Sequence, residues 1–171
     1  MNLRNLIISL LSLLIFTGCA PPVVKRLDVP RGTEIAIIAF RDCTIAGQKG
    51  CHGSGNITGM IFARVFSESN KFRAVPLSRP VGPNEVLTDD DAVDFARKKG
   101  FQFVLNGEVD EYYSVSPMTF RVDRAGVSLR ILRVSDGSVA AFFHQRKEAG
   151  SNFATPDGLI EDMAVHVRDS L

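Results

Sequence analysis

Tryptophan is absent from this 171-residue chain, and cysteine and histidine occur only three times each. The 12 phenylalanines and the aliphatic side chains must therefore fill the core. An excess of one charge is also missing, because 20 basic residues are balanced by 19 acidic ones. Such a chain has no strong electrostatic field to attract a polyanion, and we expect no nucleic-acid partner.

Hydrophobic runs of membrane length are missing as well. The longest apolar run extends from Leu6 to Phe16 and follows a single positive charge at Arg4. A helix needs about 20 apolar residues to span a bilayer, so this run is too short. Its length and its basic flank are typical of a secretory signal peptide.

The end of this run, Phe16-Thr-Gly-Cys19, resembles the lipobox of bacterial lipoprotein signal peptides. The resemblance implies that residues 1–18 are removed and that Cys19 receives acyl chains such as palmitate, which anchor the protein to a membrane. Ala20 stands where an Asp favours retention in the inner membrane, which implies the outer membrane with the protein facing the periplasm. The alternative is an ordinary signal peptide with a chance cysteine.

The remaining chain divides into a tether and one domain. Residues 19–31 contain three prolines and form a lipid anchor and a short extended tether. Residues 32–171 have the length of a single domain with its own core.

Cys43 and Cys51 remain after the lipidation site. An oxidising periplasm favours a disulfide between them, which would close a short loop containing two glycines. Free thiols are one alternative, and a metal or redox site that includes His52 is another. The metal site lacks a convincing fourth ligand, and zinc sites usually pair cysteines that are closer in sequence. We expect neither a metal nor a cofactor.

Hydrophobic periodicity predicts an α/β (α+β) fold in which helices pack on a mixed β-sheet, in the order β-α-β-α-β-β-β-α. The predicted strands span residues 33–40, 72–77, 101–113, 120–134 and 139–147, and the predicted helices begin near residues 54, 88 and 155. The continuous apolar run 33–40 is typical of a strand buried on both faces. The alternation shifts at Ile131-Leu132, which indicates a bulge.

The helix starts carry recognisable signals. Ser54 or Asn56 is the expected N-cap of the first helix, and Thr88 that of the second, with Asp91 in a capping-box position. The run Asp89–Asp91 also allows a calcium site, although helix-start chemistry explains it more simply. The apolar stripe expected for the first helix comprises Ile57, Met60, Ile61, Phe62, Val65 and Phe66.

Three blocks of the sequence resemble a known group of periplasmic domains. They are Lys71-Phe-Arg-Ala-Val75, Gly100-Phe-Gln-Phe-Val-Leu-Asn-Gly-Glu-Val109 and Val127-Ser-Leu-Arg-Ile-Leu-Arg-Val-Ser-Asp-Gly137. The group includes the N-terminal domain of TolB, the curli-secretion lipoprotein CsgG and lipoprotein activators of penicillin-binding proteins. The resemblance implies a fold and an envelope setting without catalysis, in proteins that bind other proteins or build assemblies.

Catalytic patterns are sparse. Ser54 lacks the surroundings of a nucleophile elbow, and the three histidines are scattered along the chain. The glycine-rich segment before the first helix is able to hold an anion but lacks the lysine of a P-loop. We therefore expect no enzymatic activity.

Acidic residues of one predicted strand face arginines of the next two. Glu108, Asp110 and Glu111 have these arginines as neighbours, and cross-strand ion pairing is the simpler interpretation. The alternative is a docking surface for a protein or for the anionic cell wall. The candidate partner-binding residues are Tyr112, Tyr113, Arg121, Arg124, Arg130 and Arg133.

The sequence therefore favours a non-enzymatic lipoprotein, anchored in the outer membrane through Cys19, that acts as a protein-binding adaptor in the cell envelope. One alternative is a self-associating subunit or assembly factor of an oligomeric envelope or secretion complex. A second is a small-ligand binder or enzyme that uses the loop from Cys43 to His52.

Overall fold

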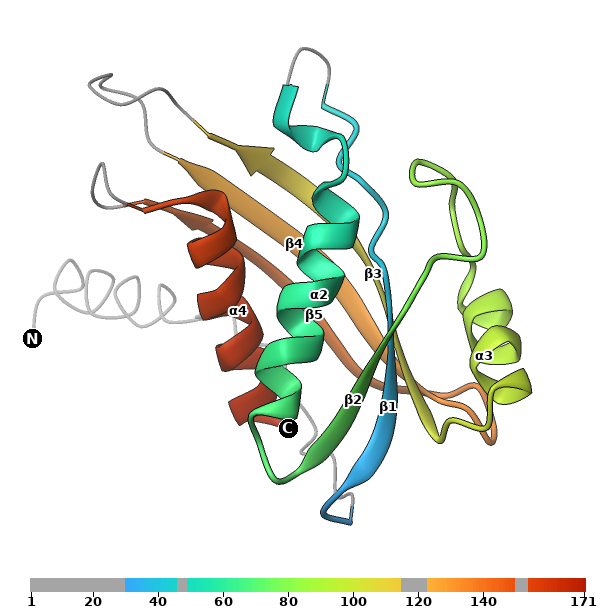
Figure 1. Ribbon diagram of the computed structural model, residues 1–171. Helices are drawn as coiled ribbons and strands as arrows, with labels where there is room; N and C mark the ends of the chain where they lie inside the picture. Colours follow the sequence, from blue (N-terminus) through green and yellow to red (C-terminus); the bar gives the residue numbers. More distant parts are fainter. Residues whose placement is uncertain (1–29, 46–48, 115–122, 150–153) are drawn as a thin grey trace, which may run out of the picture.

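A computed structural model describes residues 30–45, 49–114, 123–149 and 154–171. The helices and strands follow the predicted order, with a short additional 3-10 turn in the cysteine loop (Figure 1). The elements are β1 (Thr33–Ile38), η2 (Lys49–Cys51), α2 (Ser54–Ser67), β2 (Phe72–Leu77), α3 (Asp89–Lys98), β3 (Phe103–Tyr113), β4 (Arg124–Arg133), β5 (Val139–Glu148) and α4 (Pro156–Ser170). This confirms the predicted α+β fold with a mixed sheet.

The five strands form one sheet in the order β2-β1-β3-β4-β5. β1 pairs in parallel with β2 and β3, whereas β3, β4 and β5 form an antiparallel meander. β2 is an edge strand, a position that tolerates Pro76 because proline has no backbone N–H to donate. The pairing of β1 with β3 ends at Ile37 and Leu105, so β3 continues well past the carboxyl end of β1.

Hydrophobic layers cover both faces of β1. Ile35 and Ile37 belong to the larger core, between the sheet and the helices α2 and α4. Ala36 and Ile38 belong to a smaller core that includes residues of α3. Figure 1 shows α2 and α4 side by side on one side of the sheet, with α3 apart from them. The prediction of a strand buried on both faces is confirmed.

The helix α2 differs from its prediction in two ways. Its N-cap is Gly53, at a φ of 82°, and no side chain of the helix start caps it. Ile57 and Met60, predicted to be in the apolar stripe, are 40% and 55% exposed. Gly55 and Gly59 lie instead against the backbone of Phe40 and Ala39. This close approach turns the glycine side of the helix inward, because only a residue without a side chain fits there.

The other two helix starts match the sequence prediction. Thr88 Oγ1 accepts a hydrogen bond from the Asp91 backbone N–H, and Thr155 Oγ1 accepts one from Gly158. Asp91 in turn accepts a hydrogen bond from the Thr88 hydroxyl, which explains its position without a calcium ion.

Two bulges interrupt the meander. The one predicted at Ile131-Leu132 is present in the pairing of β4 with β5. A second lies between Val109 and Glu111 of β3 and was not predicted. Because a bulge adds one residue, it shifts the faces of the residues that follow. Tyr112 consequently packs against the larger core, on the helix-covered side of the sheet.

Candidate functional site

The carboxyl ends of β1 and β2 lie beside the middle of β3, where the sheet changes from parallel to antiparallel pairing. The chain leaves β1 through α2 to reach β2, then passes through α3 to reach β3 on the other side of β1. In open α/β sheets, such a reversal of strand order places a crevice at the carboxyl ends of the strands. The structure has a cavity at this place.

The cavity has a volume of about 190 Å³. We call it the arginine cavity, because three of its four charged lining residues are arginines. Its polar and charged lining residues are Arg41, Arg79, Asn106, Glu108, Ser128 and Arg130, and its apolar ones include Val86, Leu87, Leu129 and Phe142. Phe142 is 52% exposed and Val86 is 67% exposed, so the cavity has an apolar, accessible rim.

Arg79 follows directly after β2 and is fixed by backbone carbonyls. Its Nη1 donates to Ala39 O at 3.3 Å, and its Nη2 donates to Glu85 O at 2.7 Å. It forms no ion pair with a carboxylate of the described residues. Burial, together with the nearby positive charge of Arg41, lowers the pKa of Arg79 below its ordinary value. Arg79 is therefore a partly desolvated cation that has no direct ion-pair partner among the described residues.

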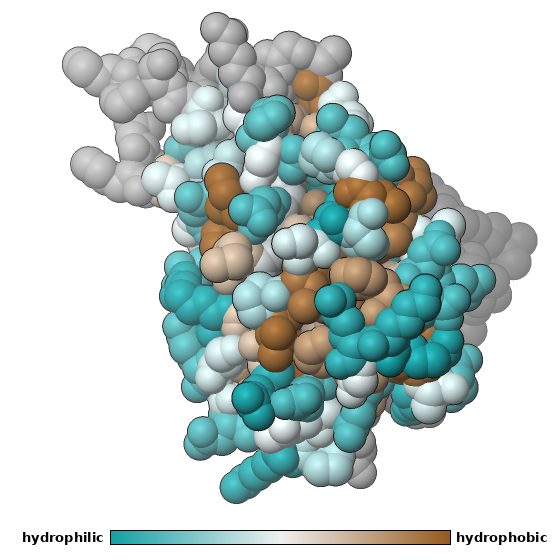
Figure 2. Space-filling view, turned by 45° about the vertical axis from the view of Figure 1, so that its right-hand side comes forward, coloured by the Kyte–Doolittle hydropathy of each residue, from teal (hydrophilic) through white to brown (hydrophobic). Residues whose placement is uncertain are grey.

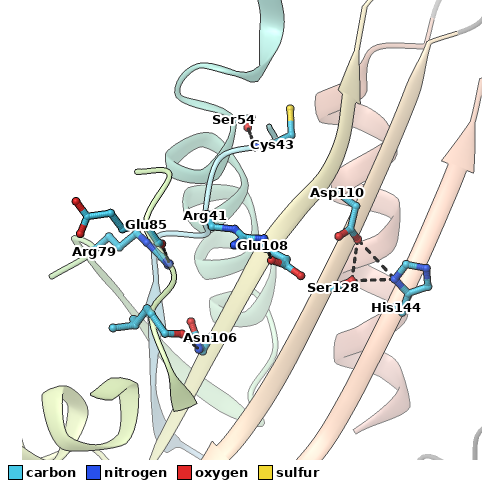
Figure 3. A network of polar contacts seen from close by, with 11 residues as sticks. Arg41, Cys43, Ser54, Arg79, Glu85, Asn106, Glu108, Asp110, Ser128 and His144 are labelled. Atoms are coloured by element: carbon cyan, nitrogen blue, oxygen red, sulfur yellow. Dashed lines mark hydrogen bonds and ion pairs between the residues drawn. The ribbon is translucent and has the colours of Figure 1, made fainter. Parts of the chain in front are cut away.

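Arg41 connects the segment after β1 to β3 at the border of the cavity. Its backbone N–H donates to Gly107 O, and its backbone carbonyl accepts from Val109 N–H, both at 2.9 Å. Its guanidinium pairs with Glu108. Figure 3 shows Arg79, Arg41 and Glu108 across the ends of β2 and β1 and the middle of β3.

Arg130 and Asn106 complete the polar lining. Arg130 Nε lies 3.1 Å from Asp89, at the start of α3. Asn106 Nδ2 donates to Leu87 O and to the Asp89 carboxylate, each at 3.1 Å. These contacts fix the loop before α3. They also explain the carboxylate at Asp89, in addition to its favourable place in the first turn of the helix, without the calcium ion that the sequence also allowed.

No described helix or loop covers the neighbouring part of β3, β4 and β5, which we call the open face. Its members alternate with core residues along the three strands. The open face comprises Glu108, Asp110, Glu111, Tyr113, Arg124, Ser128, Arg130, Phe142, His144, Arg146 and Glu148. Figure 2 shows a different side of the molecule, on which hydrophobic residues occupy separate patches among hydrophilic ones.

Ion pairs cross the strands of the open face, in agreement with the simpler interpretation of its charges. Arg146 Nε lies 2.9 Å from Glu111, and Arg124 Nε lies 3.2 Å from Glu148. Glu111 is also 3.9 Å from Arg124. The pair of Arg124 with Glu148 is exposed on both sides and contributes little to stability by itself, whereas the Glu111 side chain is only 13% exposed. These ion pairs nevertheless leave the open face nearly neutral away from the arginine cavity.

Asp110, Ser128 and His144 form a cluster on the open face that combines the residue types of a hydrolase triad (Figure 3). Ser128 Oγ donates to Asp110 at 2.8 Å and lies 2.8 Å from His144 Nδ1. The Asp110 carboxylate lies on the same side of the ring, with one oxygen 3.5 Å from Nδ1, and the donor between Ser128 Oγ and Nδ1 depends on the tautomer of His144. In a triad, Asp and Ser contact opposite nitrogens of the histidine ring. In this cluster Asp110 and Ser128 lie at the same nitrogen, so its geometry differs from that of a triad.

The cysteine loop is closed by a disulfide between Cys43 and Cys51, whose Cα atoms are 5.0 Å apart. Both residues are buried. The two Asp42 carboxylate oxygens accept 2.7 Å hydrogen bonds from Gly53 N–H and Gly55 N–H. The amide donors that an external anion would need at the start of α2 are thus used by the protein's own carboxylate. Among the described residues, no cluster of potential ligands can hold a metal ion.

The structure separates the six residues predicted to bind a partner. Tyr113, Arg124 and Arg130 lie on the open face. Tyr112 lies on the helix-covered side, where its hydroxyl donates to Asp157, and is thus apart from the other three. Its role in partner binding stays a prediction. Arg133 lies beyond the bulge at Ile131-Leu132 and pairs with Asp136 in the turn. Arg121 and the lipidation residue Cys19 lie outside the described residues.

Arg41 and Arg79 were not among the residues predicted from the sequence. The available signal was their position, since each arginine follows within three residues of the end of a buried or edge strand of the parallel part of the sheet. The carboxyl ends of parallel strands meet at one edge, which brings these two positions together. The sequence predicted the order of the elements along the chain but not the order of the strands in the sheet. Without that order, the neighbouring positions of the two arginines could not be inferred.

Comparison with solved structures supports the fold. PelC from Paraburkholderia phytofirmans, solved as a dodecamer, matches with a TM-score of 0.63 at 18% identity, over 83% of this chain and 89% of PelC. Lipoprotein GNA1162 from Neisseria meningitidis matches with a TM-score of 0.52 at 14% identity, over 80% of this chain and 96% of that protein. This fold is therefore shared with a bacterial lipoprotein.

TolB from Acinetobacter baumannii also matches, with a TM-score of 0.46 at 15% identity, over 82% of this chain and 27% of TolB. That score is too low to support an argument about the role of this chain. The sequence matches no family model, and no curated protein is similar to it. Among the described residues, no helix has the length and hydrophobicity needed to cross a membrane.

Proposed function

We propose that this protein is a non-enzymatic lipoprotein that is anchored to the outer membrane through Cys19 and docks a periplasmic or membrane protein on its open face. The observation that carries the proposal is the combination of an uncovered sheet face with the arginine cavity at its border. Phe142, half exposed among charged residues, is the type of aromatic anchor that is enriched at the centre of protein interfaces.

The lipid anchor and the docking surface act together in this proposal. Acyl chains on Cys19 confine the domain to a thin layer at the membrane, which raises its effective concentration for partners in that layer. The likeness to lipoprotein GNA1162 supports the envelope setting. Cys19→Ser is expected to move the protein from the outer-membrane fraction to the soluble fraction of the cell. Retention of the variant in the membrane would contradict lipid anchoring.

The docking surface is tested by placing a photo-crosslinking amino acid at position 142 in living cells. We expect one dominant cross-linked protein. The matched control places the same amino acid at His166, which is exposed on α4 on the opposite side of the sheet. Capture from position 166 and not from position 142 would show that the open face is not the docking surface.

A second candidate function is that of a subunit in a homo-oligomeric envelope complex. Two observations favour it: the matching PelC structure is a dodecamer, and β2 and β5 each have one strand neighbour among the described residues. An edge strand offers unpaired backbone groups to another chain. Light scattering of the purified full chain distinguishes the two candidates, because an oligomeric subunit gives a large complex and an adaptor gives a monomer.

A further inference from the structure

The arginine cavity has the features of a site for an anionic group. Arg41, Arg79 and Arg130 line it, and Glu108 is the one acidic residue of its lining. Two of these arginines have carboxylate partners, Glu108 for Arg41 and Asp89 for Arg130. Arg79 has carbonyl partners instead, and these carry no full negative charge. Glu108, Asp42 and Glu85 act on the charge of Arg79 from a distance. None of them forms a direct ion pair with it, so its guanidinium is available to a carboxylate from outside the described residues.

Burial of two of the guanidinium groups strengthens the preference of the cavity for an anion. The Nε atoms of Arg41 and Arg79 are shielded from solvent and have no hydrogen-bond partner among the described residues. Each guanidinium has therefore lost part of its hydration without full replacement by protein acceptors. An anion that reaches the exposed side of such a guanidinium interacts with it more strongly than it would with a fully solvated arginine.

The size and the lining of the cavity define the anion further. A planar guanidinium binds a carboxylate through two parallel hydrogen bonds. Glu108 at the border repels a doubly charged phosphate more than a singly charged carboxylate. Val86 and Phe142 at the rim offer apolar contact to a group attached to the anion. The cavity volume of about 190 Å³ accommodates a carboxylate with a short apolar neighbour.

We infer that the arginine cavity binds a carboxylate of a partner protein, carried beside an apolar side chain, with Arg79 as the main charge partner and Phe142 as the apolar contact. This inference rests on the proposed docking function and names the chemistry by which the open face recognises its partner.

The first experiment uses N-acetyl-phenylalanine as the probe and the full chain labelled with nitrogen-15. Amide shifts are expected at residues around the cavity, such as Gly107 and Leu129. N-acetyl-phenylalanine amide, which lacks the charge, is expected to bind at least about tenfold more weakly. Equal binding of the acid and the amide, or no binding of either, would overturn the inference. Tighter binding of inorganic phosphate than of the acid would also overturn it.

Substitutions locate the charge partner. Arg79→Gln is expected to weaken binding of N-acetyl-phenylalanine about tenfold or more, and Arg79→Lys to retain part of it, because lysine keeps the charge and loses the planar fork. Arg73→Gln is the matched control, because Arg73 is an exposed arginine on β2 whose partner is Glu34. Unchanged binding in the Arg79→Gln variant, with an unchanged amide spectrum elsewhere, would remove Arg79 from the site.

Cross-linking from position 142 separates this inference from the proposed function. Capture of a partner that is lost in the Arg79→Gln background supports both. Capture that persists in that background leaves the docking function standing and contradicts the carboxylate site. Binding of the acid without capture of any protein supports a carboxylate site and contradicts a protein partner at the open face.

Discussion

The Asp42 carboxylate accepts a 2.7 Å hydrogen bond from the backbone N–H of Gly55, the second residue of α2. Asp42 lies four residues after the end of β1 and is 4% exposed. It thus supplies the cap that the helix does not provide for itself, and it fixes the cysteine loop against the helix start. Because the Gly53 and Gly55 amides already donate to Asp42, they are not available to an external anion.

Removal of this carboxylate should destabilise the domain. Asp42→Ala leaves the Gly53 and Gly55 amides without their acceptor, and we expect a loss of about 2–3 kcal/mol in the free energy of unfolding. Asp42→Asn should be nearly as harmful, because its NH₂ group would face one of the two amide donors. Urea denaturation measures the loss. Asp90→Asn is the control, because Asp90 is an exposed residue of the first turn of α3, and it should change stability by less than about 0.5 kcal/mol.

A side chain at position 55 should not be tolerated. A Cβ atom there would lie 2.0 Å from the backbone oxygen of Phe40, so Gly55→Ala must displace the helix from β1. We expect loss of the cooperative thermal transition or a strongly lowered Tm. Gly126→Ala is the control, because its Cβ would meet neighbours at 3.5 Å, an ordinary contact distance. A Gly55→Ala variant as stable as the wild type would show that α2 does not approach Phe40 this closely.

The disulfide should stabilise the domain through its short loop. Replacement of both Cys43 and Cys51 by alanine removes the cross-link without burying hydroxyl groups, and loop-closure entropy predicts a loss of about 2–3 kcal/mol. Reduction of the wild-type protein with dithiothreitol should lower its stability by a similar amount, and the alanine variant should not respond to the reductant. If the loop were instead a catalytic or ligand site, the substitutions would abolish function while leaving stability unchanged.

Tyr112 should make the free energy of unfolding of the domain depend on pH in the alkaline range. Burial and the hydrogen bond to Asp157 raise the pKa of Tyr112 above its ordinary value of 10.0. The unfolded chain loses the phenol proton near the ordinary value, and the folded protein keeps it. The contribution to stability is therefore complete below pH 10 and is lost as the pH rises above it. Chemical denaturation of wild type and Tyr112→Phe over this range measures it, and the variant should show the shallower decline. An equal decline in both proteins would exclude Tyr112 as the source.

Local chemistry in the sequence was sufficient for most of the fold. Alternating apolar residues predicted the strands, and Thr88 and Thr155 identified two helix starts, because a hydroxyl accepts a hydrogen bond from an amide only three residues away. The shift of the alternating pattern at Ile131 predicted a bulge, because an extra residue in a strand changes the face on which the following side chains lie. Periodicity could not show which side of α2 faces the sheet, because Ile57 and Met60 are as apolar as the residues that are buried.

The tertiary structure decided what the sequence left open. Contact between Gly55 and Phe40 turned the helix, because a backbone can approach most closely where side chains are missing. The bulge after Val109 moved Tyr112 to the helix-covered side and left Tyr113 on the open face. Pairing of β1 with both β2 and β3 brought Arg41 beside Arg79, residues far apart in the chain. The sequence by itself determined the helices and strands, and it predicts a lipid anchor, because both signals depend on neighbouring residues. The candidate site depended on strand order, which is a property of the whole sheet.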